Sequence, residues 1–569
     1  MDRSGIIPKG NDGYYHPKNE DEVVALVKYA AENKLQIRAR GASHSTAWSI
    51  FTDPVEGKPE NRTLTRTPPA GRDLNLAMDR MNRLEWIDEA NGIVEAEAGI
   101  HLGADPYDPI GVASLDNGLL YQIFKKGWAL NDLGGITHQT ISGFTATGSA
   151  GGSLQFDLDN VIAIRAVDGT GRAGWIEKGD PIFPAMAVSV GLLGIITRVR
   201  LKLARTFNIY GQEVTTPTTQ PDCPIDLFGP GGATKPSMRT FLEQAPYSRM
   251  MWWPQKGAER VVIWQCVRKT ASPGETFDPV PYQEFATNLF GWIEQLVGSI
   301  FFTLLGNNNP FKTVPKLLRS YARFGHCIAR MWSGSMGPFA SRLAAAAVTI
   351  LLFLLLLVPI VIFILIPVLP EKLFPFALGI LQPMTGKGKP TLFEDYYWRS
   401  LPMDNTADDI LLGTEFTEIW IPLQYTEQCM NLLNDMFVEK GLPAVGYYST
   451  EIYATMPSKA WLSPAYSDGT DEYKDGVVRF DIFWFRGNAG GLDAVEAFYK
   501  QYWDLFLDNR IPFRFHWGKF IPAYDFPFWA DHYRKSWPMF DEFMRVRAER
   551  DPDGVFFTQY WRQRLTGRT

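Results

Sequence analysis

"LGGITHQTISGFTATGSAGGS", residues 133–153, decides the fold of this chain. Six glycines alternate there with threonine and serine hydroxyls. Residues such as Ile136, Ile141 and Phe144 favour burial, which a flexible linker, the alternative interpretation, does not need. Glycine permits close approach of the backbone, hydroxyls bind phosphate, and apolar residues anchor the loop. The segment therefore predicts a loop that wraps a large anionic cofactor.

Residues 19–45, "NEDEVVALVKYAAENKLQIRARGASHS", predict a second anion-binding turn. The acidic residues 20–22 favour a helix N-terminus, because negative charge interacts well with the helix dipole. The apolar residues that follow recur at helical spacing: Val23, Val24, Val27 and Ala30. "LQIRARG" then predicts a strand that ends at Gly41. A helix, a strand and a glycine turn bring backbone N–H groups close to a bound anion.

Composition limits the classes of function. The length of 569 residues exceeds one compact core and predicts two or three domains. The net charge of −6 gives no basic footprint, so no nucleic-acid partner is expected. The four cysteines form no CxxC pair and suit neither a zinc site nor a disulfide framework, so no metal is expected. The first residues lack a charged start followed by an apolar run, so we expect no cleavable signal peptide.

A third glycine turn, "VSVGLLGIITRVRLKL" at residues 188–203, leads into a strand that alternates from Ile196 to Leu203. In this order, "RARGASHS", "LGGITHQTISGFTATGSAGGS" and the third turn resemble the FAD-binding domain of the vanillyl-alcohol-oxidase-type (PCMH-type) flavoproteins. A single-turn GxGxxG fingerprint is absent, which disfavours an NAD-type Rossmann domain. The resemblance implies FAD as the cofactor, bound by Arg40, Gly41, Ala42, Ser43, His44, Ser45, Gly134, Gly135, Thr140, Gly143, Thr147, Gly148, Gly151, Ser153, Gly194 and Ile195.

Within the first of these loops, His44 is the most informative residue. In the sugar-alcohol and aldonolactone oxidases of this superfamily, the histidine of the G-x-x-H-S loop is often bonded covalently to the flavin 8α-methyl group. "GASHS", residues 41–45, keeps that histidine. A lone histidine in a turn is otherwise a solvated or packing residue, so this expectation depends on the resemblance. It implies FAD attached covalently through His44.

Near the C-terminus, "FRFHWGKF" at residues 513–520 is followed by "DPDGVF" at residues 551–556. This pair of motifs resembles the end of the D-arabinono-1,4-lactone oxidase family, which includes the aldonolactone and alditol oxidases. The resemblance implies that Lys519 lies beside the flavin, where a cation stabilises negative charge on the reduced ring. Glu451, in "STEIYATMPSKAWLSPAY", keeps the acid of that family and is the expected base. The expected catalytic residues are Lys519, Glu451 and His516.

The expected substrate strands depart from the family pattern. Tyr453 stands where the family usually has the arginine of Glu-x-Arg. In "VVRFDIFWF", residues 477–485, Asp481 and Phe483 stand where the alditol oxidases place a histidine and a threonine. A guanidinium that can bind two hydroxyls is therefore expected to be lost. With Tyr453, Asp481 and Phe483 as substrate-binding residues, we expect either a lipophilic small molecule, less polar than a polyol, or a substrate that is bound in a different way.

"LAAAAVTILLFLLLLVPIVIFILIPVL", residues 343–369, exceeds the about 20 residues that span a bilayer. A single pass would separate the glycine loops from Lys519, so the chain is expected to return to the side it left. Pro359 favours two half-helices that enter and return, whereas residues 286–306 offer an in-plane interfacial helix. An oligomer interface is the remaining alternative. Basic residues flank the run on both sides, so both ends are expected to face the cytoplasmic leaflet.

The predicted fold class is α+β. Residues 1–205 are expected to form a two-subdomain PCMH-type FAD-binding domain. Residues 206–505 are expected to form an α/β substrate (cap) domain with an antiparallel sheet. That domain includes a helical, membrane-associating insert at residues 280–400, and residues 506–569 return to the flavin. The protein is thus predicted to be monotopic and membrane-associated, with its catalytic domain in the cytoplasm.

These residues predict hydride transfer from a CH–OH group to flavin N5, with Glu451 or a neighbour taking the hydroxyl proton. Oxygen, a quinone or another acceptor then reoxidises the flavin. The alternative is a flavin-dependent reductase or desaturase of a C=C bond in a sterol-like or prenyl lipid. A flavoprotein without turnover that serves as a membrane scaffold is the rival from another class.

Overall fold

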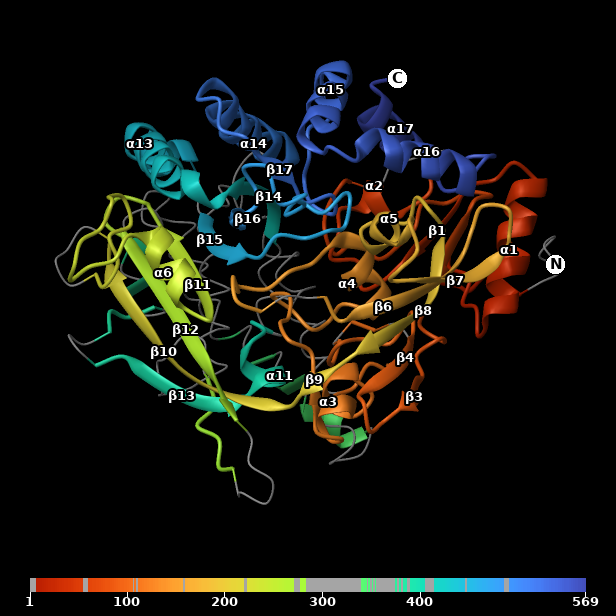
Figure 1. Ribbon diagram of the computed structural model, residues 1–569, viewed down its shortest axis with the longest axis horizontal. Coiled ribbons are helices and arrows are strands. Elements are labelled where there is room, and N and C mark those ends of the chain that lie inside the picture. The colour runs from red at the N-terminus through yellow and green to blue at the C-terminus, as the bar shows by residue number, and fades with distance from the viewer. Residues whose placement is uncertain are drawn as a thin grey trace.

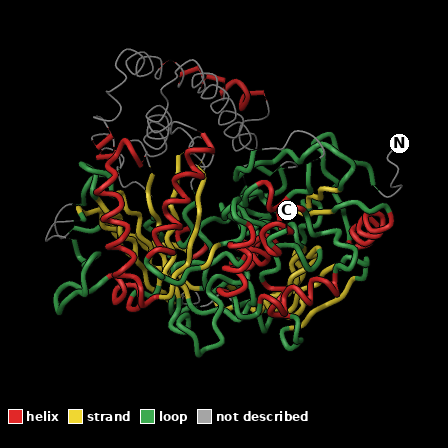
Figure 2. The backbone as a smooth tube through the Cα atoms, turned by 90° about the horizontal axis from the view of Figure 1, so that it is seen from above, coloured by secondary structure: helices red, strands yellow, loops and turns green. Residues whose placement is uncertain are grey.

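The computed structural model describes residues 7–568, except for 55–59, 106, 109–110, 157–158, 219–222, 271–276, 283–338, 345, 348–349, 352–353, 355–373, 376–377, 380–381, 386–388, 405–413, 446–447 and 486–490. The predicted interfacial segment 286–306 and most of the hydrophobic run 343–369 lie outside the described residues. The described chain forms two lobes that lie side by side (Figures 1 and 2). Its helices and antiparallel sheets confirm the predicted mixed α+β class.

The first lobe combines small sheets with short helices. Its strands are β1 (Ile37–Arg40), β2 (Leu74–Ala77), β3 (Leu84–Asp88), β4 (Ile93–Glu97), β5 (Trp128–Ala129), β6 (Val161–Val167), β7 (Ala173–Glu177), β8 (Ile195–Lys202) and β9 (Ala204–Arg205). Its helices are α1 (Glu20–Glu32), α2 (Ala47–Ile50), α3 (Leu119–Phe124), α4 (Ile141–Thr147) and α5 (Phe183–Ala187). An antiparallel sheet has the order β3-β4-β8-β6-β7, while β1 pairs with β2 in parallel and β5 pairs with β9.

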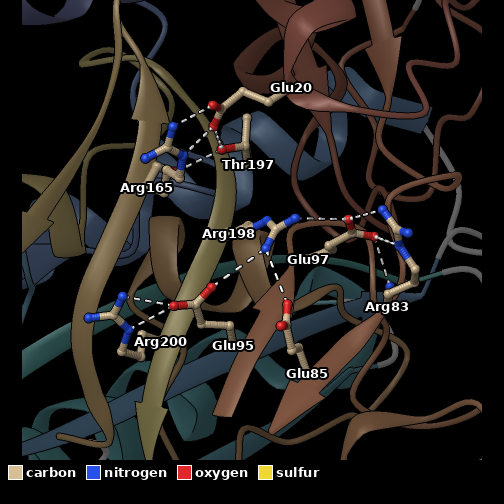
Figure 3. Close-up of polar contacts among 9 residues, drawn as sticks. All are labelled: Glu20, Arg83, Glu85, Glu95, Glu97, Arg165, Thr197, Arg198 and Arg200. Atoms are coloured by element: carbon tan, nitrogen blue, oxygen red, sulfur yellow. Dashed lines mark hydrogen bonds and ion pairs between the residues drawn. The ribbon is translucent and has the colours of Figure 1, made fainter. Parts of the chain in front are cut away.

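Helix α1 forms where the apolar spacing predicted a helix. The side chain of Asn19 caps it by accepting a hydrogen bond from the backbone N–H of Glu22 (3.0 Å). At its first residue, Glu20 accepts hydrogen bonds from Arg165 on β6 and from Thr197 on β8, each 2.7 Å long (Figure 3). Further ion pairs continue this network along β4 and β8. Helix α1 is thereby held against the five-stranded sheet.

The second lobe is an eight-stranded antiparallel sheet with helices packed against it (Figure 1). Its strands are β10 (Phe207–Pro217), β11 (Tyr247–Trp253), β12 (Arg260–Thr270), β13 (Thr391–Tyr396), β14 (Thr414–Pro422), β15 (Tyr448–Thr455), β16 (Val477–Phe485) and β17 (Arg514–Phe515). The order across the sheet is β13-β10-β12-β11-β15-β16-β14-β17. The helices of this half of the chain are α6 (Met238–Gln244), α11 (Tyr397–Ser400), the 3-10 helix η1 (Leu423–Tyr425), α13 (Thr426–Val445), α14 (Gly491–Asp508), α15 (Phe526–Ser536), α16 (Phe540–Arg550) and α17 (Gln559–Thr566).

Helix α14 covers one face of this sheet. The hydroxyl of Tyr499 donates a hydrogen bond to the backbone oxygen of Ile482 on β16 (3.2 Å). The indole of Trp503 donates one to Oγ1 of Thr417 on β14 (3.1 Å). Side chains alternate between the two faces of a strand, so the residues next to Thr417 on β14 and next to Ile482 on β16 point to the opposite face of the sheet. They point to the first lobe, where they line a cavity.

The chain leaves the sheet after β12 and returns to it at β13, which pairs with β10 at the edge of the sheet. The intervening segment is thus an insertion at one edge of a continuous sheet. Buried Arg260 holds the returning chain by donating hydrogen bonds to the backbone oxygens of Leu378 (3.1 Å) and Gln382 (2.5 Å). Within the part of the chain that the structure describes, no helix combines the length and apolar character needed to cross a membrane.

The C-terminal segment joins the two lobes. It contributes β17 to the second-lobe sheet, beside β14. In the first lobe, the N–H of Ile37 donates a hydrogen bond to the backbone oxygen of Val555 (2.9 Å). The N–H of Thr46 donates one to the backbone oxygen of Gly518 (2.8 Å), so the turn after β17 lies at the junction of the lobes.

Glu415 is a second connection between the lobes and a test of the packing. Its buried carboxylate, on β14, accepts hydrogen bonds from the backbone N–H of Thr63 (3.1 Å) and from Nη1 of Arg62 (3.2 Å). Glu415→Ala is expected to lower the free energy of unfolding by about 2–4 kcal/mol, because buried donors lose their acceptor. The exposed Glu439 on α13 is the matched control, and Glu439→Ala is expected to change that energy by less than about 0.5 kcal/mol. Urea unfolding followed by tryptophan fluorescence measures the stability of both variants. An unfolding midpoint of Glu415→Ala equal to that of the wild-type protein would contradict the connection.

Candidate active site

A cavity of about 350 Å³ lies where the two lobes meet. The first lobe contributes the turn after β1, the loop around α4 and the start of β8, and the second contributes β14, β15, β16 and the turn after β17. The predicted cofactor residues that line it are Arg40, Gly41, Ala42, Ser43, His44, Ser45, Gly134, Gly135, Thr140, Gly143, Thr147, Gly194 and Ile195. The predicted catalytic and substrate-binding residues line it as well: Lys519, Glu451, His516, Tyr453, Asp481 and Phe483.

Three predicted cofactor residues lie outside this lining. Gly148 ends α4 in the left-handed conformation, with φ of 67°. A Cβ on Gly151 would lie 2.2 Å from Oδ1 of Asp132, so the absence of a side chain there permits close packing. Ser153 donates a hydrogen bond to the backbone oxygen of Pro246 (2.6 Å). These residues shape the loop, and the structure does not bring them to the cavity.

The first-lobe side of the cavity fits a phosphate-bearing cofactor. A Cβ on Gly41 would lie 2.5 Å from Oγ1 of Thr140, so only glycine lets the two loops approach each other. Buried polar atoms without a hydrogen-bond partner among the described residues lie on the same side: Nε of Arg40, Oγ of Ser43 and Nε2 of His44. Buried polar groups are normally hydrogen-bonded, so this group of atoms indicates a polar ligand. The residues present therefore fit FAD.

His44 has the chemistry of a nucleophile. Burial, and then the neighbouring basic groups, with His138 the first of them, keep the pKa of His44 well below its usual value. The rings of His44 and His138 have their centroids 5.6 Å apart. The His44 imidazole is therefore neutral at neutral pH and keeps a nitrogen lone pair.

The turn after β17 brings Lys519 beside His44. Its Nζ donates a hydrogen bond to the backbone oxygen of His44 (3.2 Å). Burial lowers the pKa of Lys519 to about 8, although the carboxylate of Glu418 opposes the shift. His516 shapes the turn, because its Nδ1 accepts a hydrogen bond from the N–H of Gly518 (3.1 Å). Burial lowers the pKa of His516 to about 4, so its ring is neutral at neutral pH.

Strand pairing arranges the second-lobe side of the cavity in rows. Residues paired across antiparallel strands point to the same face of a sheet. Taken from β15 to β16 to β14, the three rows on the cavity face are Ser449, Phe483 and Phe416; Glu451, Asp481 and Glu418; and Tyr453, Arg479 and Trp420. The middle row places three carboxyl groups side by side. We call Glu451, Asp481 and Glu418 the carboxyl row.

The members of the carboxyl row titrate differently. Burial raises the pKa of Glu451, and the hydroxyl of Tyr453 donates a hydrogen bond to its Oε2 (2.6 Å). Burial raises the pKa of Asp481 well above its usual value, and the nearby carboxylate of Glu418 adds to the shift. Burial also acts against ionisation of Glu418, but the neighbouring basic groups, led by His516, outweigh it and lower the pKa of Glu418. Protons are thus held on Glu451 and Asp481 more readily than on Glu418.

Although Tyr453 replaces the expected arginine on β15, the cavity still contains a guanidinium from another strand. Arg479 lines the cavity, and its guanidinium lies 4.1 Å from the centre of the Tyr453 ring. Its ion pairs reach Glu418 (3.4 Å) and Asp481 (3.6 Å). Sequence reasoning missed both Arg479 and Glu418, although each lies two residues from a cavity-facing neighbour of its strand. The period of two along "VVRFDIFWF" was the signal, since Asp481 and Phe483 were already assigned to the site.

Apolar side chains make up another part of the lining, from β11, the insertion and the segment before β14: Met251, Trp253, Leu378 and Met403. Leu378 belongs to the segment that follows the hydrophobic run. Phe374 of the same segment packs against Trp253, with ring centroids 6.1 Å apart. The insertion therefore contributes directly to the cavity.

No protein-family model matches the chain. The D-arabinono-1,4-lactone oxidase of Eremothecium gossypii is 27% identical over 267 residues, which cover 46% of this chain and 42% of that protein. The enzyme of the same name from Saccharomyces cerevisiae is 27% identical over 218 residues, or 37% of this chain and 36% of the relative. The L-gulonolactone oxidase of Mus musculus is 22% identical over 263 residues, or 46% of this chain and 49% of the relative. Each match thus spans less than half of the length of the relative.

Solved structures match over nearly the whole chain. Cholesterol oxidase from Brevibacterium sterolicum has a TM-score of 0.61 and 16% identity, covering 97% of this chain and 93% of that chain. A solvent-stable cholesterol oxidase has a TM-score of 0.60 and 16% identity, with 97% and 94% covered. At this identity the likeness shows a shared fold.

Proposed function

Because the chain belongs to the FAD-linked aldonolactone oxidase family of the PCMH-type flavoprotein superfamily, we propose that it is an FAD-dependent oxidoreductase acting on a CH–OH group. One observation carries the proposal: a single cavity joins the glycine loops of the first lobe to Lys519 and the carboxyl row of the second. FAD bound there supplies the acceptor for the hydride. Oxygen, a quinone or another electron acceptor is the second substrate.

Glu451 is the proposed base for the substrate hydroxyl. Burial raises its pKa and so makes its carboxylate a stronger proton acceptor, while the hydroxyl of Tyr453 fixes its orientation. Lys519 is a cation below its pKa of about 8, so its charge stabilises the negative charge that develops beside it during oxidation. His516 positions Lys519 through the turn that both residues share. Asp481 and Phe483 are proposed to contact the substrate.

The proposed substrate carries an apolar group next to its CH–OH group. Leu378, Met251 and Met403 supply apolar surface within the same cavity as Glu451. An apolar lining stabilises alkyl groups by removing them from water and offers no partner for sugar hydroxyls. The relatives are named for oxidation of lactones, and the structural neighbours for oxidation of cholesterol. An alkyl-bearing hydroxylactone or an amphiphilic alcohol combines these features.

A membrane surface is the proposed location of this substrate. The described residues between 339 and 354 are helical, and their large apolar side chains are exposed: Phe339, Leu343, Ile350, Leu351 and Leu354. Contiguous exposed apolar side chains typically mark an interaction surface. The same segment begins the hydrophobic run whose far end leads to Leu378 in the cavity. This arrangement supports monotopic attachment to the leaflet that holds the substrate.

A substrate comparison tests the proposed function. We expect kcat/KM for a 2-hydroxy-γ-lactone with a hexyl chain to exceed that for D-arabinono-1,4-lactone, because the chain contacts the apolar lining. Leu378→Ala should lower kcat/KM for the alkyl lactone about tenfold and leave the sugar lactone nearly unchanged. Leu392→Ala, at an exposed position on β13, is the matched control and should alter neither. Oxidation of neither compound, with FAD bound, would refute the proposal.

The pH dependence tests the part given to Lys519. As pH rises through about 8, Lys519 loses its proton and its charge, so kcat/KM is expected to fall there. Arginine stays protonated throughout this range, so Lys519→Arg should remove the fall while lowering the rate because the geometry changes. Lys500→Arg, at an exposed position on α14, should leave the profile unchanged. A fall near pH 8 that persists in Lys519→Arg would assign the titration to another group.

The covalent bond proposed for His44 has its own test. The neutral imidazole next to the flavin site is the proposed point of attachment. After acid precipitation, flavin colour should stay in the pellet of the wild-type protein and move to the supernatant for His44→Ala. His16→Ala, in which the lost histidine lies outside the cavity lining, should behave as wild type. Colour in the wild-type supernatant would show that FAD is bound without the bond.

A further inference from the structure

We propose that Arg479 determines how the substrate is held, because it supplies from β16 the guanidinium that residue 453 lacks on β15. This inference deepens the proposed function and rests on it. The group that Arg479 is proposed to bind is a carbonyl or hydroxyl oxygen on the carbon next to the one that is oxidised.

The pairing of β15 with β16 places Arg479 on the cavity face of the sheet. Tyr453 and Arg479 are paired directly across β15 and β16, so their side chains point to the same face of the sheet. Neighbouring strands lie about 4.8 Å apart, so a guanidinium on β16 is displaced sideways by one strand spacing and still faces the cavity. Arg479 lines the cavity and is only 6% exposed.

The hydrogen bonds of Arg479 to other described residues use part of its donors. Its Nη1 donates to the backbone oxygen of Ala150 (3.1 Å) and to Oε1 of Glu418 (3.4 Å). Its buried Nε has no hydrogen-bond partner among the described residues and lies 3.6 Å from Oδ2 of Asp481. A guanidinium offers five N–H donors in a fixed plane. Donors therefore remain for a ligand in the cavity.

One arrangement explains two departures from the family pattern, Tyr453 on β15 and Asp481 on β16. Asp481 and Glu418 flank the guanidinium, so the carboxylate of Glu418 balances the charge of the arginine and the acid on β16 lies beside it. Tyr453 then serves two neighbours: its ring lies under the guanidinium, and its hydroxyl binds Glu451. A tyrosine in place of the arginine thus keeps the base oriented while Arg479 provides the cation.

The arrangement selects a chemical class of substrate. Glu451 binds the hydroxyl that is oxidised, and Arg479, one row along the same face, binds an oxygen on the adjacent carbon. The apolar lining at Leu378 and Met251 receives the remainder. The class is therefore a compound with two neighbouring oxygens and an apolar tail, such as an alkyl 2-hydroxylactone or an alkyl 1,2-diol.

Binding of γ-decalactone to the FAD-loaded protein tests the inference without turnover. This compound has the lactone carbonyl and a hexyl tail but no hydroxyl to oxidise; the cyclic ether without the carbonyl is the control ligand. Loss of a hydrogen bond from a charged donor is expected to raise the Kd of the lactone about tenfold or more in Arg479→Gln. The Kd of the ether should change less than about twofold. Arg399→Gln, an exposed arginine on α11, is the control variant and should change neither.

The exchange Tyr453→Arg with Arg479→Tyr is the decisive variant. It returns the guanidinium to β15 and should recover most of the affinity for the lactone that Arg479→Gln loses. Unchanged lactone binding in Arg479→Gln, or equal losses for lactone and ether, would overturn the inference. If Arg479→Gln fails to bind FAD, Arg479→Lys serves in its place. The Kd of the lactone should then rise while the Kd of the ether stays constant, because lysine lacks the planar guanidinium.

Failure of the inference and failure of the proposed function give different results. If the lactone depends on Arg479 but hydroxylactones are not oxidised, the inference stands and the proposed reaction is wrong. If hydroxylactones are oxidised with an unchanged KM in Arg479→Gln, the reaction stands and the part given to Arg479 is wrong.

Discussion

The register between β15, β16 and β14 is the constraint on which the site depends. Side chains alternate along a strand, so a slip of one residue on β16 would turn Arg479 and Asp481 towards α14 and bring Phe480 to the cavity. Packing opposes such a slip, because Phe480 and Ile482 are fully buried on the face that α14 covers. The hydrophobic contacts of one face thus fix the chemistry of the other.

The second requirement is charge balance in a buried space. Isolated buried charges are costly, and they persist when they are paired or change their protonation state. Here Glu418 is favoured as an ion near Arg479 and Lys519, while burial raises the pKa of Glu451 and of Asp481, so that these two groups take up a proton more readily. Arg479 and Lys519 place positive charge on the same side of the cavity as the carboxyl row. Such charge suits negative charge developing on an oxygen or on a reduced cofactor.

Local patterns allowed much of the first lobe to be predicted. The helix at α1, the strand before Gly41 and the glycine loops depend on spacing within a few residues, and the loops do meet at one cavity. Lys519 and His44 were named from motifs, and the structure places them in contact. Gly148 and Gly151 could not be separated from the lining glycines, because helix termination and loop packing need glycine for their own reasons.

Long-range pairing accounts for what the sequence did not reveal. Nothing in the sequence alone states that residue 453 lies opposite residue 479, so the arginine on β16 was not assigned to the site. The same holds for Leu378, which lines the cavity and whose backbone oxygen accepts a hydrogen bond from Arg260 on β12. Register and insertion geometry are tertiary properties, whereas turn chemistry is local.

In the proposed function, one cavity holds FAD and a CH–OH substrate together. The most direct measurement is anaerobic mixing of the FAD-loaded protein with an alkyl 2-hydroxylactone while the visible absorbance of the flavin is recorded. The absorbance is expected to be lost in a single turnover, with one oxidised product formed per FAD. Absorbance that stays constant, with the lactone shown to be bound, would contradict it.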